Sequence, residues 1–192
     1  MAIHMAKSVA DKLGRGISPR AFMDGMTKNK ETFVSLYENF EWPGGEDREF
    51  FESLRFRDDL RCLILMADWC GDCVKNIPPV FRALEAGEVP VDVLIKEEHP
   101  DTMRQFLTLG GESVPVVIFT DTGGAVLGTW GPRPSHVQEP MVRFKQENPD
   151  RNAPDYQEKL AAVREEIRRR YGEGTGYQAD VLREIRELIS GF

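Results

Sequence analysis

The stretch RCLILMADWCGDCVKNIPPV, from Arg61 to Val80, decides the fold. Its opening part, through Ala67, is a nearly continuous apolar run of strand length, which is typical of a strand buried on both faces. A helix is expected to follow from about Gly71 to Ala86. A buried strand that leads directly into a helix is typical of an α/β sheet.

Further strands and helices are expected on the C-terminal side of this unit. They are a strand at 91–95, a helix at about 100–109, hairpin strands at 116–120 and 125–130, and a helix at about 135–146. The first two strands are joined through a helix and should be parallel, whereas the hairpin strands should be antiparallel. The expected fold is therefore α/β, with a central mixed sheet of about four strands flanked by helices on both faces.

Helical segments are expected at both ends of this core. On the N-terminal side, Ser18 and Pro19 suit an N-cap and a first helical position, and apolar residues then recur at helical spacing. A polar, proline-containing stretch begins at Asn148, and two amphipathic segments follow it. We therefore expect a helical N-terminal extension at 1–59, a core domain at 60–148 and a helical C-terminal extension at 149–192.

The composition is that of a soluble globular chain. Of its 192 residues, 41% are apolar and 30% are charged, and the net charge is −7. The negative sign argues against a general binder of nucleic acid or of anionic membranes. The N-terminus has no apolar core of signal-peptide length, and no apolar run approaches the ~20 residues that span a bilayer. A cytoplasmic location is therefore expected, where a Cys-x-x-Cys indicates redox chemistry or metal binding more often than a structural disulfide.

Two of the three cysteines, Cys70 and Cys73, lie where the helix after the first strand should begin. The carboxyl end of such a strand is where open α/β sheets place their sites. The N-terminus of a helix favours negative charge, so Cys70 is expected to be a stabilised thiolate. Cys73 lies within one helical turn of it. Cys70 can then attack a substrate disulfide, and Cys73 can resolve the mixed disulfide and release the reduced substrate.

Zinc binding and inert thiols are the alternative interpretations of the cysteine pair. A structural zinc site commonly needs four ligands. The remaining cysteine and histidines are Cys62, His4, His99 and His136, and they lack the spacing of a second ligand pair. Redox chemistry is therefore favoured, with no metal site and no cofactor beyond the dithiol.

Three motifs in the correct order resemble the thioredoxin family: ADWCGDC, a proline five residues after the second cysteine (Pro78), and SVPVVIF. The resemblance covers roughly Leu60 to Glu147. It implies that Val114–Pro115 is a cis peptide facing the thiols, with a strand edge open to substrate backbone. Alternatively, Pro115 is an ordinary loop proline.

The same resemblance assigns two further residues to the substrate-binding surface. Trp69 should flank the nucleophile, unless it is a core aromatic residue. Gly131, just after the hairpin, corresponds to the family's substrate-facing glycine.

The sequence departs from the family pattern at several positions. Ile64 stands where thioredoxins carry a buried aspartate that accepts the resolving thiol's proton. Asp72 and Lys75 are the candidate substitutes, unless they are only surface charges. Gly71 and Asp72 lie between the cysteines, and Asp72 replaces the proline of the usual CGPC. Its carboxylate should oppose the thiolate and push the couple toward reductant.

The ends of the chain also differ from those of a full thioredoxin. The first strand and helix of the family are not evident, so the core resembles the smaller, glutaredoxin-sized form, although without a glutathione-binding signature. The implied partners are disulfide-containing protein substrates and an electron donor, either a reductase or a low-molecular-weight thiol. The alternative is a non-catalytic binding module or redox sensor that docks a protein partner.

Overall fold

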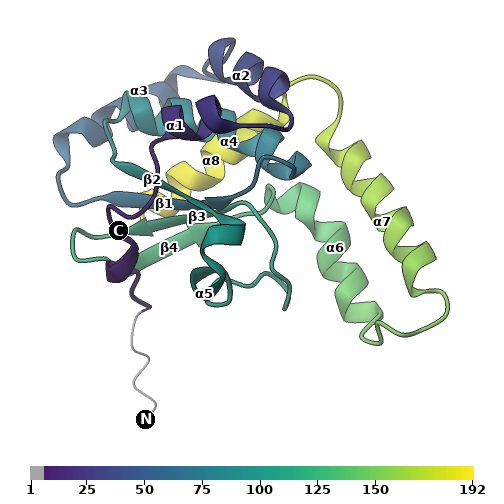
Figure 1. Cartoon of the computed structure of the whole chain (residues 1–192). Coiled ribbons are helices and arrows are strands. Elements are labelled where there is room, and N and C mark those ends of the chain that lie inside the picture. Colours follow the sequence, from purple (N-terminus) through teal and green to yellow (C-terminus); the bar gives the residue numbers. More distant parts are fainter. Residues whose placement is uncertain (1–6) are drawn as a thin grey trace.

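The central sheet has four strands in the order β2-β1-β3-β4 (Figure 1). The strands are β1 (Arg61–Met66), β2 (Val91–Ile95), β3 (Val116–Thr120) and β4 (Val126–Trp130). β1 pairs in parallel with β2 and antiparallel with β3, and β3 pairs antiparallel with β4. The expected mixed four-stranded α/β sheet is therefore confirmed. In this computed structural model, residues 7–192 are described, and His4 and the start of the expected N-terminal extension lie outside them.

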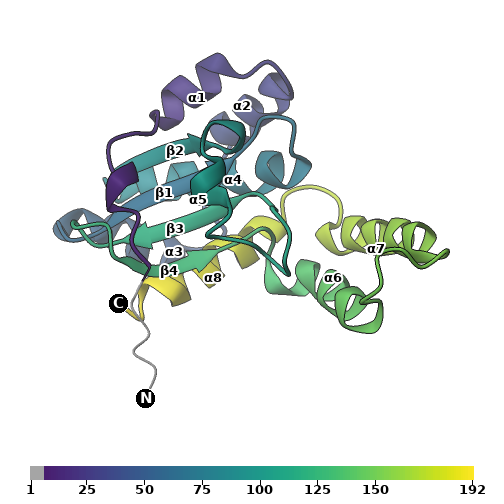
Figure 2. The same cartoon turned by 60° about the horizontal axis from the view of Figure 1, so that its bottom comes forward.

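Eight α-helices lie in the described residues. They are α1 (Pro19–Gly25), α2 (Lys30–Glu38), α3 (Gly45–Ser53), α4 (Gly71–Ala86), α5 (Pro100–Met103), α6 (Ser135–Glu147), α7 (Tyr156–Tyr171) and α8 (Tyr177–Ile189). Figure 2 shows α3, α4 and α8 behind the sheet and α5 in front of it. Short 3-10 helices occur at Ala10–Lys12, Leu54–Phe56 and Lys96–Glu98.

The buried core is continuous from the N-terminal helices to α8. Phe33 of α2 contacts both Phe22 of α1 and Phe81 of α4. On α8, the apolar stripe that includes Val181 and Ile185 is buried in the same core. Its burial holds α8 against α4 and β4, so both termini of the chain contribute to the support of the sheet.

The N-terminal segment also contains sheet-like contacts, which the sequence analysis did not find. Ser8 bridges Ala125 beside β4, and Ile17 bridges Val93 of β2. A Cβ on Gly124 would lie 2.4 Å from the backbone of Ala10, so only glycine permits that approach. Single bridges are too short to show the alternating pattern by which a strand is recognised in a sequence.

The helix expected at about 100–109 is much shorter in the structure. α5 ends at Met103, and the following residues form turns that include Leu109, with φ +52°, and Gly110, with φ +78°. The apolar residues misled the prediction because Leu107 and Leu109 are 48% and 41% exposed rather than directed inward.

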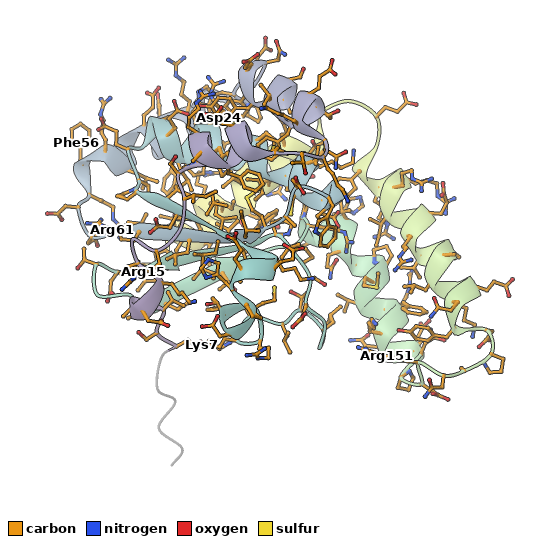
Figure 3. All side chains as sticks on the ribbon, in the orientation of Figure 1. Lys7, Arg15, Asp24, Phe56, Arg61 and Arg151 are labelled. Atoms are coloured by element: carbon orange, nitrogen blue, oxygen red, sulfur yellow. The ribbon has the colours of Figure 1, made fainter. Side chains whose placement is uncertain are left out.

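α6 and α7 form an antiparallel helical hairpin that projects beside the sheet (Figure 1). Figure 3 shows Arg151 in the connection between them, at the end of the hairpin far from the sheet. No helix among residues 7–192 has the length and hydropathy to cross a membrane.

Candidate active site

Cys70 is the N-cap residue of α4, and Cys73 lies in the first turn of that helix. β1 ends at Met66, so the connecting loop carries both thiols to the carboxyl edge of β1. The Cys73 backbone N–H donates a hydrogen bond to the Cys70 sulfur at 3.5 Å. A free helix N–H group therefore points at the sulfur of Cys70, which is the arrangement that stabilises a thiolate.

The two thiols differ in exposure and in acidity. Cys70 is 8% exposed and Cys73 is 0% exposed, so a substrate can reach only the first sulfur directly. The pKa of Cys70 is lowered to about 7, chiefly because the Cys73 thiol donates a hydrogen bond to it, and burial only partly opposes this. The pKa of Cys73 is raised well above its ordinary value, first by burial and then by its hydrogen bond to Cys70.

The loop before β3 lies against the first thiol. The Val114–Pro115 peptide is cis, as the family resemblance implied. In its protonated form, the Cys70 thiol donates a hydrogen bond to the Val114 carbonyl at 3.3 Å. The Cys70 sulfur and the Val114–Pro115 segment are thus neighbours.

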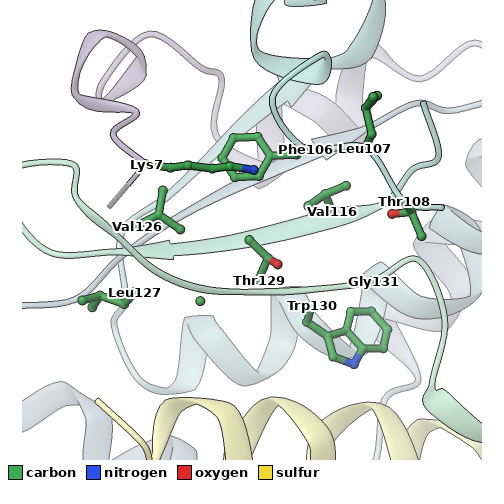
Figure 4. A pocket seen from close by; sticks show the side chains of 11 residues that line it. Lys7, Phe106, Leu107, Thr108, Val116, Val126, Leu127, Thr129, Trp130 and Gly131 are labelled. Carbon is green, nitrogen blue, oxygen red and sulfur yellow. The ribbon is translucent and has the colours of Figure 1, made fainter. Parts of the chain in front are cut away.

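Gly131, the residue after β4, packs against this loop. A Cβ at Gly131 would lie 2.2 Å from the Pro115 carbonyl oxygen, and the residue has φ +131°. Gly131 lines a hollow of about 290 Å³. Figure 4 shows Gly131 at this hollow, with the Trp130 side chain directed toward α8. A glycine is required here because the backbones of the two loops touch.

Trp69 directly precedes Cys70 and faces solvent. Its side chain is 47% exposed, so the alternative of a core aromatic residue does not hold. The indole N–H donates a hydrogen bond to Glu97 at 2.7 Å, and the Lys96 ammonium lies 5.4 Å from the ring centroid. These contacts hold a large apolar surface beside Cys70 and open to solvent.

Comparison with known proteins identifies the family and the fold. A family model described as thioredoxin matches residues 16–167. The chain belongs to the thioredoxin family. Two solved structures share the fold at 19% sequence identity. An HIV epitope scaffold aligns with TM-score 0.67, over 97% of this chain and 99% of its own. A protein of unknown function from Pseudomonas aeruginosa aligns with TM-score 0.50, over 100% and 99%. No curated protein matches the chain.

In this thioredoxin-family chain, the side chains of Arg133 and Tyr171 hold the carboxylate of Asp72, which lies between the two cysteines. The sequence did not predict either contact. Arg133 donates two hydrogen bonds to the Asp72 carboxylate, at 2.9 and 2.8 Å, and the Tyr171 hydroxyl donates a third at 2.7 Å. Both members of the ion pair are less than one-fifth exposed. Arg133 and Tyr171 lie 61 and 99 residues from Asp72, and no local pattern links them.

The expected effect of Asp72 on the nucleophile is correct in direction but does not dominate. Its charge raises the pKa of Cys70, yet this contribution is smaller than the lowering by the Cys73 thiol, and the net pKa is lowered. The Cys70 thiolate is therefore stabilised overall, as its position at the helix N-terminus predicts, and Asp72 opposes this only in part. The bidentate guanidinium of Arg133 offsets the carboxylate.

Removal of Arg133 should expose the full charge of Asp72 to the nucleophile. We expect Arg133→Met to raise the pKa of Cys70 by about one unit, and the double variant Asp72→Asn/Arg133→Met to return it to near 7, because a neutral pair then replaces an ion pair. The thiolate absorbance near 240 nm, followed against pH, measures both values. An unchanged pH midpoint of the thiolate absorbance in Arg133→Met would show that Arg133 does not offset the charge of Asp72 at Cys70.

Lys75, the second candidate proton acceptor, is directed toward the C-terminal helices. Its ammonium lies 5.1 Å from the ring centroid of Tyr171 and 5.5 Å from that of Tyr177. The Tyr177 hydroxyl donates a hydrogen bond to the Lys75 carbonyl at 2.9 Å. These contacts give Lys75 a role in docking α4 onto α7 and α8.

Ile64 is fully buried, which leaves an apolar side chain at the position of the family's aspartate.

Gly71 begins α4, and a Cβ there would meet no atom within 4 Å. All three cysteines are free thiols, and Cys62 is buried in the core, where desolvation raises its pKa. Among residues 7–192, no three His, Cys, Asp or Glu side chains gather as a potential metal site.

Proposed function

We propose that this chain is a thiol–disulfide oxidoreductase that reduces protein disulfides by dithiol exchange. The observation that carries the proposal is the asymmetry of the cysteine pair. Cys70 has a lowered pKa and keeps 8% exposure at a helix N-terminus, whereas Cys73 is fully buried one turn behind it with a raised pKa. An accessible thiolate with a protected second thiol is what a two-step exchange requires.

The chemistry balances within the dithiol. The Cys70 thiolate attacks one sulfur of a substrate disulfide, so that a Cys70–substrate bond forms while the substrate S–S bond breaks. Cys73 then gives up its proton, which a departing substrate thiolate can accept, and attacks the Cys70 sulfur, which releases the second substrate thiolate. Two electrons pass to the substrate, its thiolates take up two protons, and Cys70 and Cys73 end as a disulfide.

Two structural features next to Cys70 are suited to binding a protein substrate. Trp69 offers an exposed aromatic surface next to Cys70, and the Val114–Pro115 segment lies beside the sulfur. An extended peptide can pair with such a backbone segment while its disulfide meets the thiolate. Trp69, Val114, Pro115 and Gly131 are therefore the proposed substrate-binding residues, and Gly71, Asp72 and Lys75 surround the reacting pair.

The pKa of Cys70 is compatible with the reducing direction. A strongly depressed thiol pKa stabilises the reduced form and makes the couple oxidising, whereas a value of about 7 is a moderate shift. We place the activity in the cytosol, where a dithiol is kept reduced. The exchange itself needs no bound cofactor, and a reductase or low-molecular-weight thiol must reduce the Cys70–Cys73 disulfide after each cycle.

A turnover assay tests the proposal. Insulin, or a small neutral disulfide, is supplied with dithiothreitol as the electron donor, and reduction is followed over many equivalents of protein. We expect catalytic turnover above the rate with dithiothreitol alone. Reduction of one equivalent or less, with retained binding of a partner after both cysteines become serine, would instead support a binding module or redox sensor.

A further inference from the structure

A cleft with a positively charged lining lies beside the reactive thiol, between the loop at 108–113 and the α6–α7 hairpin. Its volume is about 220 Å³. Its lining includes the cations of Arg133, Lys145 and Arg164, and none of the ten lining residues is acidic. In a chain with net charge −7, a cavity with three cations and no carboxylate in its lining is unlike the average surface.

The cleft is close to Cys70 through two direct connections. Ser113 lines it, and the next residue, Val114, holds its carbonyl 3.3 Å from the Cys70 sulfur. Arg133 lines it too, and its guanidinium bridges from Asp72, between the cysteines, to the Gln138 side chain at 2.7 Å. A ligand in the cleft would therefore contact residues that lie next to those in contact with the Cys70 sulfur.

Two of the cations are available to a ligand. Arg133 is already paired with Asp72. Within residues 7–192, neither Lys145 nor Arg164 forms a salt bridge, and Lys145 is held by a hydrogen bond to the Tyr156 hydroxyl at 2.9 Å. A fixed ammonium and an exposed guanidinium on facing helices are suited to a carboxylate, which a guanidinium binds through two hydrogen bonds.

We propose that this cleft binds a carboxylate-bearing arm of the disulfide substrate and so selects acidic disulfides for reaction at Cys70. The inference rests on the proposed function and narrows its substrate class. A cavity of about 220 Å³ is smaller than most ligand pockets, so it admits an acidic side chain or a small organic acid rather than a folded segment. The α6–α7 hairpin supplies Lys145 and Arg164, which gives this projecting element a role in substrate choice.

The experiment compares disulfides of different charge. The reduced protein is reacted with 3,3′-dithiodipropionate (anionic), 2-hydroxyethyl disulfide (neutral) and cystamine (cationic), and each rate constant is divided by that of the same disulfide with dithiothreitol. We expect the anionic probe to be preferred to the neutral one by on the order of tenfold, and the cationic probe to react most slowly. A normalised preference at or below one for the anionic probe, together with no preference for the acidic peptide described below, overturns the proposal. If none of the probes reacts, the proposed function itself fails.

A matched pair of variants locates the effect. Arg164→Gln removes a cation that lines the cleft, and we expect it to lower the anionic preference about threefold. Arg168→Gln removes the same charge one turn further along α7, where the side chain is 73% exposed and pairs with Glu165, and it should leave the preference unchanged. Equal losses in both variants would show a general effect of charge on α7 and would overturn the cleft as the site.

The carboxylate could belong to an acidic protein segment or to a small organic acid, and two further disulfide substrates distinguish these sources. Each is a symmetric peptide disulfide, with glutamates flanking the cysteine in one and lysines flanking it in the other. Preference for the glutamate peptide together with weak preference for 3,3′-dithiodipropionate indicates an acidic segment of a protein. The opposite result indicates a small acid. Either result supports the cleft, whereas no charge preference in both series refutes it.

Discussion

Cys73→Ser is expected to stop the reaction at the mixed disulfide. The Cys70 thiolate still attacks because its position at the start of α4 is unchanged, but no sulfur lies behind it to displace the substrate. The serine hydroxyl and the backbone N–H at position 73 can still donate hydrogen bonds to the Cys70 sulfur, so the pKa of Cys70 should stay lowered and the first step should proceed. Mass spectrometry after incubation with a peptide disulfide should show one covalent adduct for each chain, and dithiothreitol should remove it.

Cys70→Ser is the matched control. It leaves the buried Cys73, which has 0% exposure and a raised pKa, as the remaining member of the pair. We expect no adduct and loss of turnover by a factor of about 1,000 or more, because neither access nor ionisation favours the second thiol. Equal adduct formation in the two variants would contradict the assigned order of the cysteines.

Gly131→Ala should have the largest effect on stability of any glycine substitution near the site. Its Cβ would lie 2.2 Å from the Pro115 carbonyl oxygen, and its φ of +131° is strained for alanine. The steric overlap and the backbone conformation together should cost about 3 kcal/mol or more, which corresponds to a fall in Tm of roughly 10 °C. The displaced Pro115 loop should also slow the reaction of Cys70. Urea unfolding and thiol alkylation measure the two effects.

Gly71→Ala provides the comparison at the other side of the site. A Cβ there meets no atom within 4 Å, and alanine is favourable in the first turn of a helix. Its unfolding free energy should stay within about 0.5 kcal/mol of the native value. If Gly131→Ala changed the unfolding free energy as little as Gly71→Ala, the close contact between Gly131 and the Pro115 loop would not require a glycine.

Much of the fold was predictable because it depends on local patterns. The apolar run that forms β1, the turn between β3 and β4, and the helix starts at Pro19 and Gly71 are each signalled by neighbouring residues. α5 was overestimated because exposed leucines imitate a buried helical stripe, and the bridges of Ser8 and Ile17 were missed because each is a single pair. A sequence pattern records periodicity, whereas burial depends on contacts between distant segments.

The candidate site was predictable to the same extent. The thiol pair and the Val114–Pro115 cis peptide follow from short motifs. Arg133 and Tyr171 were not found, because they reach Asp72 only after β4 and α7 have been placed by the rest of the fold. The Asp72 carboxylate is held by an arginine and a tyrosine from two other parts of the chain, so its effect on Cys70 could not be judged from Asp72 alone.

The most direct test of the account is the pH dependence of Cys70 alkylation. The reduced protein is treated with iodoacetamide between pH 5 and 10, and the modified residue is identified by mass spectrometry. We expect the rate to rise with pH to a midpoint near 7, with Cys70 modified first and Cys73 protected. About half of Cys70 is then thiolate at pH 7 and about one-tenth at pH 6. A midpoint near 9, or first modification at Cys73, would contradict an accessible thiolate at the start of α4.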